Sequence, residues 1–325
     1  MELSGKRILV TGVTGTLGLR IAKRLLSEAL EVRGLIRQAE RFNEFESLGI
    51  TPVFGDLTNQ MSLEKAMDQI DWVVHCAAYL GDDENLAHQS NVEGVIHLAT
   101  AALDAGARVL HISTTSVYGE PANGHMTESS PLAVDHPAPY IRTKIRSEQI
   151  LLDYAARGLD VRILRPGAIC AEHDSHWGDR QVRRMQEADR VTWVHPADLV
   201  NWVHADNIAE MVVLVLTRGK AGDVFHAVDA NIPETDFRMH LIEASSKPYQ
   251  VPARAAERPT YATDKIRSLG YEPVRSFDET MDALLALFSL PAARMTSGAI
   301  VDSRTTSAVA AASKQPTNML RRRGR

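Results

Sequence analysis

Tyr140 and Lys144 are the two residues whose types and spacing most directly predict chemistry. They lie in Pro139-Tyr-Ile-Arg-Thr-Lys144, which opens a predicted helix that runs to about Arg157 and is stopped by Gly158. Residues four apart share one face of a helix, and a neighbouring ammonium lowers the pKa of a phenol because it favours tyrosinate. The pair is therefore a candidate acid/base unit. Because this spacing occurs by chance in many helices, it needs support from other features.

A run of hydroxyl side chains offers partners for this unit. Ser113-Thr-Thr-Ser-Val-Tyr-Gly119 follows an apolar stretch, 108–113, that predicts a strand. Thr114, Thr115 and Ser116 are expected at the carboxyl end of that strand. Many ordinary strand-to-loop connections are rich in Ser and Thr, so the run alone indicates little.

A glycine-rich stretch near the N-terminus predicts a phosphate-binding turn. The apolar run Ile8-Leu-Val10 leads into a loop with Gly12, Gly15 and Gly18, after which the sequence has helical periodicity. A strand, a tight turn and a helix N-terminus in this order are typical of a dinucleotide site. Its glycines would permit an unusual φ, close approach of the backbone to a pyrophosphate, and close packing of helix on strand. The spacing is Gly-x-x-Gly-x-x-Gly, and without this context such a run is most often an ordinary turn.

Strands and helices alternate along the chain, which predicts an α/β fold with a doubly wound parallel sheet and helices on both faces. Ligands of such folds bind at the carboxyl ends of the strands. The residues that fall there are Gly12, Arg37, Asp56, Ala77 and Ser113. The predicted strands are 8–10, 32–36, 51–56, 72–76 and 108–113, and the predicted helices are 17–29, 62–70, 91–103 and 140–157.

Arg37 bears on which dinucleotide the site would bind. It stands at the end of the second predicted strand, where many dinucleotide folds place an acidic residue that binds the ribose 2′-hydroxyl. A cation there, with Arg41 close behind, would instead accommodate a 2′-phosphate. The sequence therefore favours NADP over NAD, unless Arg37 is only a solvated loop charge.

In combination, these motifs make the sequence similar to the extended short-chain dehydrogenase/reductase superfamily, which contains the NAD-dependent epimerase/dehydratases. The resemblance covers roughly residues 5–290. It implies a Rossmann-type dinucleotide-binding domain with a small C-terminal α-rich substrate lobe. The matching segments are 11–18 (TGVTGTLG), 55–57 (GDL), 75–78 (HCAA), 91–94 (NVEG), Tyr140 with Lys144, 164–167 (LRPG) and 202–209 (WVHADNIA).

The resemblance implies a role for each matching residue. Tyr140 would be the general acid/base at the reacting oxygen, Lys144 would bind the nicotinamide ribose and tune Tyr140, and Thr114 would hydrogen-bond the carbonyl or alcohol oxygen. Thr115 and Ser116 are weaker candidates for substrate contacts. The chemistry implied is hydride transfer at nicotinamide C4, coupled to proton transfer through Tyr140. The residues expected at the cofactor are Gly12, Thr14, Gly15, Thr16, Leu17 and Gly18 in the turn, Arg37, Asp56 and Leu57 near the adenosine, and Ala77, Ala78, Lys144 and Pro166 near the ribose and nicotinamide.

The same pattern predicts the domain boundaries. Residues 1–166 are expected to form the dinucleotide-binding domain, with 200–230 returning to its sheet. The substrate lobe is expected to comprise 167–199 and 231–290. Residues 291–325 contain no aromatic residue and are dominated by Ala, Ser, Thr and Arg, so we expect a disordered tail.

The expected lobe carries polar and aromatic side chains that could face a substrate. Trp177 and Trp193 are expected either to wall a pocket or simply to pack. Asp174 lies between His173 and His176 in the sequence, but a fourth ligand is lacking. We therefore expect no metal site.

The leading functional hypothesis is an NADP-preferring reductase or dehydrogenase of a small carbonyl or alcohol substrate. A nucleotide-sugar epimerase or dehydratase would use the same three residues. Such proteins usually carry an Arg just before the aromatic-Val-His/Tyr-x-Asp element, and the segment here is Leu199-Val-Asn-Trp202, although Arg180, Arg183 and Arg184 could compensate. A non-catalytic dinucleotide sensor is the third hypothesis, against which the intact acid/base residues argue.

Composition limits the partners to be expected. The 325 residues are 44% hydrophobic and 24% charged, with a net charge of −5 that divides into −11 over 1–290 and +6 over 291–325. An acidic body argues against nucleic acid as the main partner. No apolar run could cross a bilayer and no signal-peptide pattern opens the chain, so we expect a cytoplasmic protein that acts on a small molecule. Cys76 and Cys170 lack metal or disulfide spacing, and helices 91–103 and 140–157 could form a homodimer interface.

Overall fold

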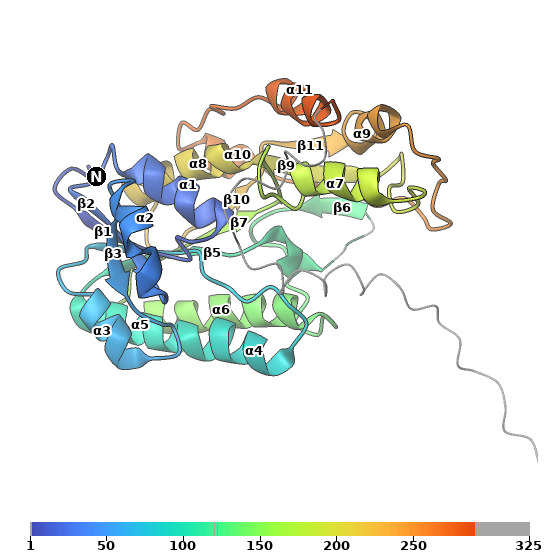
Figure 1. Ribbon diagram of the computed structural model, residues 1–325. Coiled ribbons are helices and arrows are strands. Elements are labelled where there is room, and N and C mark those ends of the chain that lie inside the picture. The colour runs from blue at the N-terminus through green and yellow to red at the C-terminus, as the bar shows by residue number, and fades with distance from the viewer. Residues whose placement is uncertain (1, 120, 122, 290–325) are drawn as a thin grey trace, which may run out of the picture.

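The computed structural model describes residues 2–119, 121 and 123–289. The predicted tail, 291–325, lies outside the described residues. Figure 1 shows a central sheet with helices above and below it, and a second group of helices and short strands beside it.

The central sheet has seven strands in the order β10-β7-β5-β4-β1-β2-β3, and every neighbouring pair is parallel. β4 and β7 are buried along their whole length. Burial on both faces explains why the central strands are continuous apolar runs rather than alternating ones. The predicted doubly wound α/β fold is confirmed. The strands are β1 (Arg7–Thr11), β2 (Glu31–Ile36), β3 (Thr51–Phe54), β4 (Trp72–His75), β5 (Arg108–Ile112), β7 (Val161–Pro166) and β10 (Val224–Ala227).

Helices cover both faces of this sheet (Figure 1). α1 packs against α8 on one face, and α5 contacts α3 and α6 on the other. The predicted helix 91–103 begins within η2, a π-helical turn that precedes α5. The helices are α1 (Thr16–Leu25), α2 (Phe42–Glu46), α3 (Gln60–Ala66), α4 (Glu84–His88), α5 (Gly94–Ala105), α6 (Pro139–Ala155), α8 (Ala205–Arg218) and α10 (Asp264–Arg267), with the short turns η1 (Ala39–Arg41), η2 (Gln89–Glu93) and η3 (Thr115–Tyr118).

A three-stranded sheet and three helices form a second lobe with its own apolar core, which includes the buried side chains of Trp202, Phe237 and Leu284. The sequence did not predict α7, because 171–197 shows no clean period, nor β8, which is a strand of only three residues. The elements of this lobe are β8 (Ala168–Cys170), β9 (Leu199–His204), β11 (Ala230–Pro233), α7 (Asp179–Glu187), α9 (Arg238–Ser245) and α11 (Phe277–Leu287). A further two-stranded sheet pairs β6 (Asn123–Met126) with β12 (Arg258–Tyr261).

One strand lies in a different sheet from the one predicted. Of the segment 200–230, only β10 joins the central sheet, whereas β9 pairs with β8 and β11 in the lobe. The apolar pattern of β9 does not distinguish the two sheets, because Val203 is buried in the main core while Val200 and Trp202 are buried in the core of the lobe.

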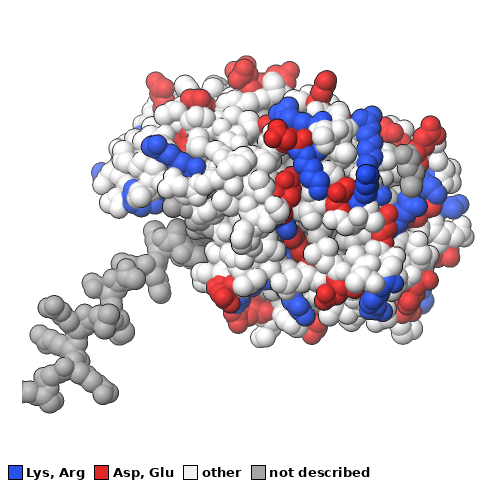
Figure 2. Space-filling model, turned by 180° about the vertical axis from the view of Figure 1, so that it is seen from behind, with Lys and Arg blue, Asp and Glu red and all other residues white. Residues whose placement is uncertain are grey.

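The described surface carries charges of both signs. On the face seen in Figure 2, Lys and Arg side chains lie among Asp and Glu side chains and form no continuous basic surface of the kind that nucleic acid requires. None of the helices in the described ranges combines the length and the apolar character needed to cross a bilayer.

Candidate active site

The helix that carries Tyr140 and Lys144 is fixed to the central sheet by a buried ion pair. α6 begins with Pro139 in its first turn, where the fixed φ of proline suits a helix start. Glu148, one turn after Lys144, accepts hydrogen bonds from Arg165 of β7 at 3.0 and 2.6 Å, and their side chains are 1% and 5% exposed. Removing one partner would leave the other charge buried and unpaired, so this contact strongly constrains where α6 lies.

Asn91, in the π-helical turn η2, fixes the other side of α6. Its Nδ2 donates to Thr143 Oγ1 at 3.0 Å, and its carbonyl oxygen accepts from Ser147 Oγ at 2.6 Å. Its Oδ1 accepts from the backbone N–H of Tyr79 at 2.7 Å. The loop that follows β4, with Ala77 and Ala78, is therefore held close to the helix that carries the candidate acid/base residues.

The glycine-rich turn lies where β1 ends and α1 begins. Gly12 has a φ of +67°, and a Cβ at this position would come within 2.7 Å of the backbone N of Ala77. A Cβ at Gly18 would come within 2.2 Å of the carbonyl oxygen of Gly12. Gly15 is the N-cap of α1 and makes no side-chain cap, and the first turn of α1 has no acidic residue. Backbone N–H groups at the start of α1 thus face a close-packed turn, an arrangement that fits the pyrophosphate of a dinucleotide.

A loop of the second lobe reaches the start of α1. Thr16 Oγ1 lies 2.9 Å from both the carbonyl oxygen and Oδ2 of Asp174. The carboxylate of Asp174 is also paired with Arg180 of α7, which offsets its negative charge beside the glycine-rich turn. Thr14 and Leu17, close to Thr16 in the sequence, are half-buried. The glycine-rich turn is therefore in contact with the second lobe through Thr16.

The remaining expected cofactor residues lie at or just after the carboxyl ends of β2, β3, β4 and β7. Asp56 is half-buried, and its Oδ1 accepts from the N–H and hydroxyl of Thr58, both at 2.9 Å. Leu57 and Pro166 are buried, and Ala77 and Ala78 are half-buried.

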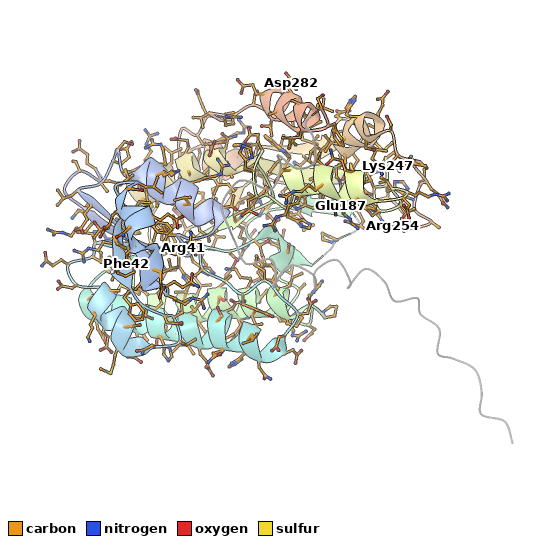
Figure 3. The ribbon with its side chains drawn as sticks, viewed as in Figure 1. Arg41, Phe42, Glu187, Lys247, Arg254 and Asp282 are labelled. Carbon is orange, nitrogen blue, oxygen red and sulfur yellow. The ribbon has the colours of Figure 1, made fainter. Side chains whose placement is uncertain are left out.

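Two arginines lie near the end of β2. Arg37 is exposed, and none of the ion pairs within 4.0 Å among the described residues includes it. Arg41 is paired with Glu44 at 2.9 Å and lies over the ring of Phe45. Figure 3 shows Arg41 beside Phe42, where η1 leads into α2. Arg37 is thus the cation that remains available to a ligand at this edge.

Tyr140 and Thr114 come together at the carboxyl end of β5. Burial raises the pKa of Tyr140 to about 12, against a lowering by its hydrogen bond with Thr114. Thr114 Oγ1 also accepts from the backbone N–H of Ser116 at 3.1 Å, which orients its side chain. At neutral pH Tyr140 is therefore a phenol, the form that can donate a proton.

Lys144 is 2% exposed and faces β5. Its Nζ donates to the carbonyl oxygen of Ile112 at 2.6 Å and lies 3.2 Å from Nε2 of His111. Burial lowers the pKa of Lys144 to about 8, although Glu148 acts in the opposite direction. The expectation that Lys144 lowers the pKa of Tyr140 is wrong for this arrangement, because the ammonium is directed to β5 and the pKa of Tyr140 is raised.

Two buried histidines lie on the central sheet next to Lys144, and no sequence pattern indicated a role for them. His75 of β4 and His111 of β5 are in register, and their rings stack with centroids 5.2 Å apart. Thr11 Oγ1 lies 2.7 Å from Nδ1 of His75. The signal that could have found them is a histidine at the same level of two adjacent apolar strands.

We expect these buried imidazoles to make the fold sensitive to acid. Burial, and to a lesser degree the charge of Lys144, lowers the pKa of His75 to about 3 and lowers the pKa of His111 well below 6.5. Below pH 6.5 the unfolded chain binds protons at these histidines that the folded protein does not. The free energy of unfolding should thus fall as the pH decreases, by about 1.4 kcal/mol per pH unit for each histidine.

Denaturant unfolding between pH 6 and 4.5 tests this acid sensitivity. His75→Phe should lose less stability per pH unit than the wild type, by about 1.4 kcal/mol, because other titrating groups cancel in the comparison. Equal slopes for the two proteins would contradict the expectation.

The four residues expected to contact substrate are divided between the two lobes. Thr115 is 4% exposed and accepts from Asn201 Nδ2 at 2.7 Å, while Ser116 is half-buried. Trp177 and Trp193 are both partly buried against the core of the second lobe. Guanidinium groups lie over both rings, Arg238 at 4.6 Å from the centroid of Trp177 and Arg184 at 3.9 Å from that of Trp193.

Arg184 is a cation of the lobe that none of the ion pairs within 4.0 Å among the described residues includes. Burial and the charge of Arg238 lower its pKa. Arg180 lies one turn earlier on α7, and its partner Asp174 contacts Thr16 of α1. Arg184 itself is placed by its contact with the ring of Trp193.

Within the described ranges, no group of three or more His, Cys, Asp and Glu side chains has an arrangement that could bind a metal ion. His173 and His176 are exposed, and Asp174 is engaged by Arg180.

Comparisons with known proteins relate this geometry to a family. A family model described as the NAD dependent epimerase/dehydratase family matches residues 8–230. The chain is 30% identical over 229 residues to 4-hydroxy-2-methyl-3-oxo-4-farnesyl-3,4-dihydroquinoline-1-oxide ketoreductase of Stigmatella aurantiaca, which covers 69% of this chain and 68% of the relative. It is 29% identical over 316 residues to dTDP-glucose 4,6-dehydratase of Streptomyces antibioticus, which covers 84% of this chain and 89% of the relative.

Solved structures of such enzymes share the fold. DesIV, the dTDP-glucose 4,6-dehydratase of Streptomyces venezuelae with NAD and TYD bound, is 27% identical, with a TM-score of 0.74 over 87% of this chain and 97% of that one. The UDP-glucose 4-epimerase of Thermus thermophilus in complex with NAD is 23% identical, with a TM-score of 0.71 over 87% of this chain and 99% of that one, which bears on the fold alone. The chain therefore belongs to the NAD-dependent epimerase/dehydratase family of the extended short-chain dehydrogenase/reductases and is an enzyme.

Proposed function

We propose that this enzyme is an NADP-preferring reductase that transfers hydride to the carbonyl of a small substrate, or in reverse oxidises the alcohol. The observation that carries the proposal is Tyr140, held as a phenol beside Thr114 at the carboxyl end of β5, with the buried ammonium of Lys144 one helical turn away. The ketoreductase of Stigmatella aurantiaca supports it as a relative that is named for carbonyl reduction.

The glycine-rich turn supports the cofactor part of the proposal. Its backbone N–H groups at the start of α1 would bind the pyrophosphate, and Gly15 at the N-cap adds no side chain there. Lys144 would bind the nicotinamide ribose. The other residues proposed at the cofactor are Thr14, Gly15, Thr16 and Leu17 in the turn, Arg37, Asp56 and Leu57 at the adenosine, and Ala77, Ala78 and Pro166 at the ribose and nicotinamide.

The side chains of this site would manage the proton that accompanies reduction. When bound, the nicotinamide supplies the hydride from C4. Tyr140 would donate its phenol proton to the substrate oxygen as negative charge develops there, and its raised pKa keeps that proton in place at neutral pH. Thr114, which is hydrogen-bonded to Tyr140, would donate a hydrogen bond to the same oxygen.

Cofactor stoichiometry tests this proposal. The purified chain, supplied with NADPH and a panel of ketones, should oxidise one NADPH for each carbonyl that it reduces. The proposal would be rejected if no ketone caused oxidation of NADPH or NADH while a nucleotide sugar was turned over without net consumption of cofactor.

Replacing Arg37 by Ser should weaken NADPH binding about 10- to 100-fold, because a hydrogen bond to a charged group contributes about 1.5–3 kcal/mol. Arg37 is exposed and has no described carboxylate partner, so its charge is available to a 2′-phosphate. Fluorescence titration with NADPH and NADH measures the effect. NADH, which lacks the 2′-phosphate, is the internal control and should bind almost as before; a parallel loss for both would argue against this role of Arg37.

We also propose that substrate selection belongs to 167–199 and 231–290. Trp177 and Trp193 lie on this lobe, and their stacked arginines would restrict the shape of the substrate. Ser116 and Thr115 would contribute from the opposite side. The hydrogen bond from Asn201 of the lobe to Thr115 supports this arrangement, because it holds the lobe close to the end of β5.

A nucleotide-sugar epimerase or dehydratase is the second candidate, and one observation favours it. Arg184 has no carboxylate partner among the described ion pairs and lies over the ring of Trp193 in the lobe, so its charge could bind a diphosphate. The likeness to DesIV supports the same candidate. Asn201, in place of the Arg expected just before Trp202, favours the reductase instead.

A homodimer through α5 and α6 is a further part of the proposal. Ile96 of α5 and Leu152 of α6 are 39% and 44% exposed, and Leu86 of the neighbouring α4 is 47% exposed. Apolar side chains on adjacent helices are suited to a two-fold interface, and light scattering by the purified chain would measure the state.

A further inference from the structure

Among the described residues, the two groups that accept hydrogen bonds from Lys144 both belong to β5. One is the carbonyl oxygen of Ile112 at 2.6 Å, and the other is Nε2 of His111 at 3.2 Å. Both Lys144 and His111 are almost fully buried, at 2% and 0% exposed. Without the imidazole, one buried carbonyl would have to satisfy an ammonium that has three donors.

The surroundings of His111 determine which of its nitrogens carries the proton. Burial and the charge of Lys144 lower its pKa well below 6.5, so the ring is neutral. Because Nε2 faces an ammonium, which only donates, Nε2 must accept and the proton must lie on Nδ1. Nδ1 is buried and has no hydrogen-bond partner among the described residues. The Nδ1–H of His111 is therefore an unsatisfied buried donor, while Nε2 faces Lys144. A buried polar group without a partner is costly, so a role for the other nitrogen would explain why the histidine stands here.

His75 supports the position of the His111 ring. The two rings stack at 5.2 Å with an interplanar angle of 25°. Thr11 Oγ1 accepts from the N–H of Ala77 at 3.2 Å, so its own hydrogen can be donated to Nδ1 of His75 at 2.7 Å. Packing and hydrogen bonds thus connect the start of the glycine-rich turn, through two imidazoles, to Lys144.

We propose that His111 is a positioning residue that holds the Lys144 ammonium at the cofactor site by accepting its hydrogen bond, with His75 holding the His111 ring in place. The inference rests on the proposed function in one respect, because that function gives the Lys144 ammonium its task, the binding of the nicotinamide ribose. Loss of the acceptor would favour neutral Lys144, which has lost a donor and its charge.

Titratable groups on the elements packed around Lys144 also affect its pKa. Glu148 lies one turn later on α6 and favours the charged form of Lys144, and Cys76, just after β4, acts in the same direction. His75 and His111 are both neutral near pH 7, because burial lowers their pKa values. A change at His111 would therefore act through its hydrogen bond and not through a charge.

Titration of the Lys144 side chain by NMR tests the inference without any cofactor. In protein labelled with ¹⁵N-lysine, the Nζ signal is assigned with Lys144→Met and followed from pH 6 to 10. His111→Phe should lower the pKa of Lys144 by about one unit or more, since a hydrogen bond to a charged group is lost. His111→Gln, which keeps an acceptor oxygen, should restore most of the shift. An unchanged titration in His111→Phe would overturn the inference.

Wild-type protein labelled with ¹⁵N-histidine provides a second test that no folding defect can obscure. His111 should show a protonated Nδ1 and an unprotonated, accepting Nε2 near neutral pH. The opposite tautomer would overturn the inference by itself.

NADPH binding separates this inference from the proposed function. His111→Phe should bind NADPH about as well as the wild type at pH 6, where Lys144 is charged in both, and several-fold more weakly at pH 8. His226→Phe is the matched control, because His226 is equally buried but bonds to Tyr118 and Ala262, away from Lys144; it should show no such dependence on pH. If the wild type bound neither NADPH nor NADH, the proposed function would fail, and the NMR result would still decide the role of His111.

Discussion

Tyr140→Phe should reduce kcat for carbonyl reduction by about 10²- to 10⁴-fold, the usual contribution of a positioned general acid. The hydroxyl of Tyr140 is hydrogen-bonded to Thr114, just after β5, and its raised pKa keeps it protonated at neutral pH. The substitution removes this proton and leaves the ring in place. Single-turnover oxidation of NADPH should therefore slow, while the dissociation constant for NADPH should change little.

Tyr154→Phe is the matched control for this substitution. Tyr154 lies on the same helix, and its hydroxyl bonds to Thr100 at 2.7 Å, in the packing of α6 against α5. This variant should keep the wild-type kcat. If Tyr140→Phe turned over ketones as fast as the wild type, the acid/base role would be rejected.

The parallel central sheet could be predicted from the sequence, though not its strand order, because local features mark where most of its strands and helices begin and end. Strands such as β1 and β4 are buried on both faces, so they are short apolar runs, and glycines and polar residues separate them from helices. Tyr140 was expected near Thr114 for a similar reason. Thr114 follows β5, and the helix that comes after a strand begins at the edge of the sheet where that strand ends.

In the second lobe, β8 was not predicted and β9 was assigned to the wrong sheet, because the strands of the lobe are short and pair with distant segments. β8 has three residues and pairs with β9, and β9 pairs in turn with β11. An apolar pattern does not identify the sheet that a strand joins. α7 was missed as well, because Arg180, Arg183 and Arg184 interrupt its apolar residues.

The contacts of Lys144 could not be predicted from the sequence either, because they depend on the register between strands. Only the pairing of β4 with β5 brings His75 beside His111, and only the placement of α6 directs Lys144 to them. The spacing of Tyr140 and Lys144 is helical in either case. It predicts that the two share a face, but it does not say which group the ammonium contacts.

Gly18→Ala should be the most damaging single-methyl change in the glycine-rich turn. The new Cβ would lie 2.2 Å from the carbonyl oxygen and 2.7 Å from the carbonyl carbon of Gly12, both backbone atoms that cannot move aside as a flexible side chain could. Overpacking of this kind costs about 1–3 kcal/mol or more, and the higher helix propensity of Ala recovers about 1 kcal/mol at most. We expect the free energy of unfolding to fall by about 2 kcal/mol and NADPH binding to weaken at least tenfold, because Gly12 and the start of α1 must shift.

Gly15→Ala separates the packing role of this turn from its binding role. Gly15 has an ordinary φ of −95°, and a Cβ there would meet its nearest neighbour, the carbonyl oxygen of Gly12, at 3.4 Å, an ordinary contact. Its stability should therefore equal that of the wild type, whereas a methyl group at the N-cap of α1 would stand where the pyrophosphate approaches and should weaken NADPH binding. Denaturant unfolding and NADPH titration of both variants measure the two roles independently. Equal stability of Gly18→Ala and the wild type would mean that the approach of α1 to β1 does not depend on the missing side chain, and the glycine at this position would then need another explanation.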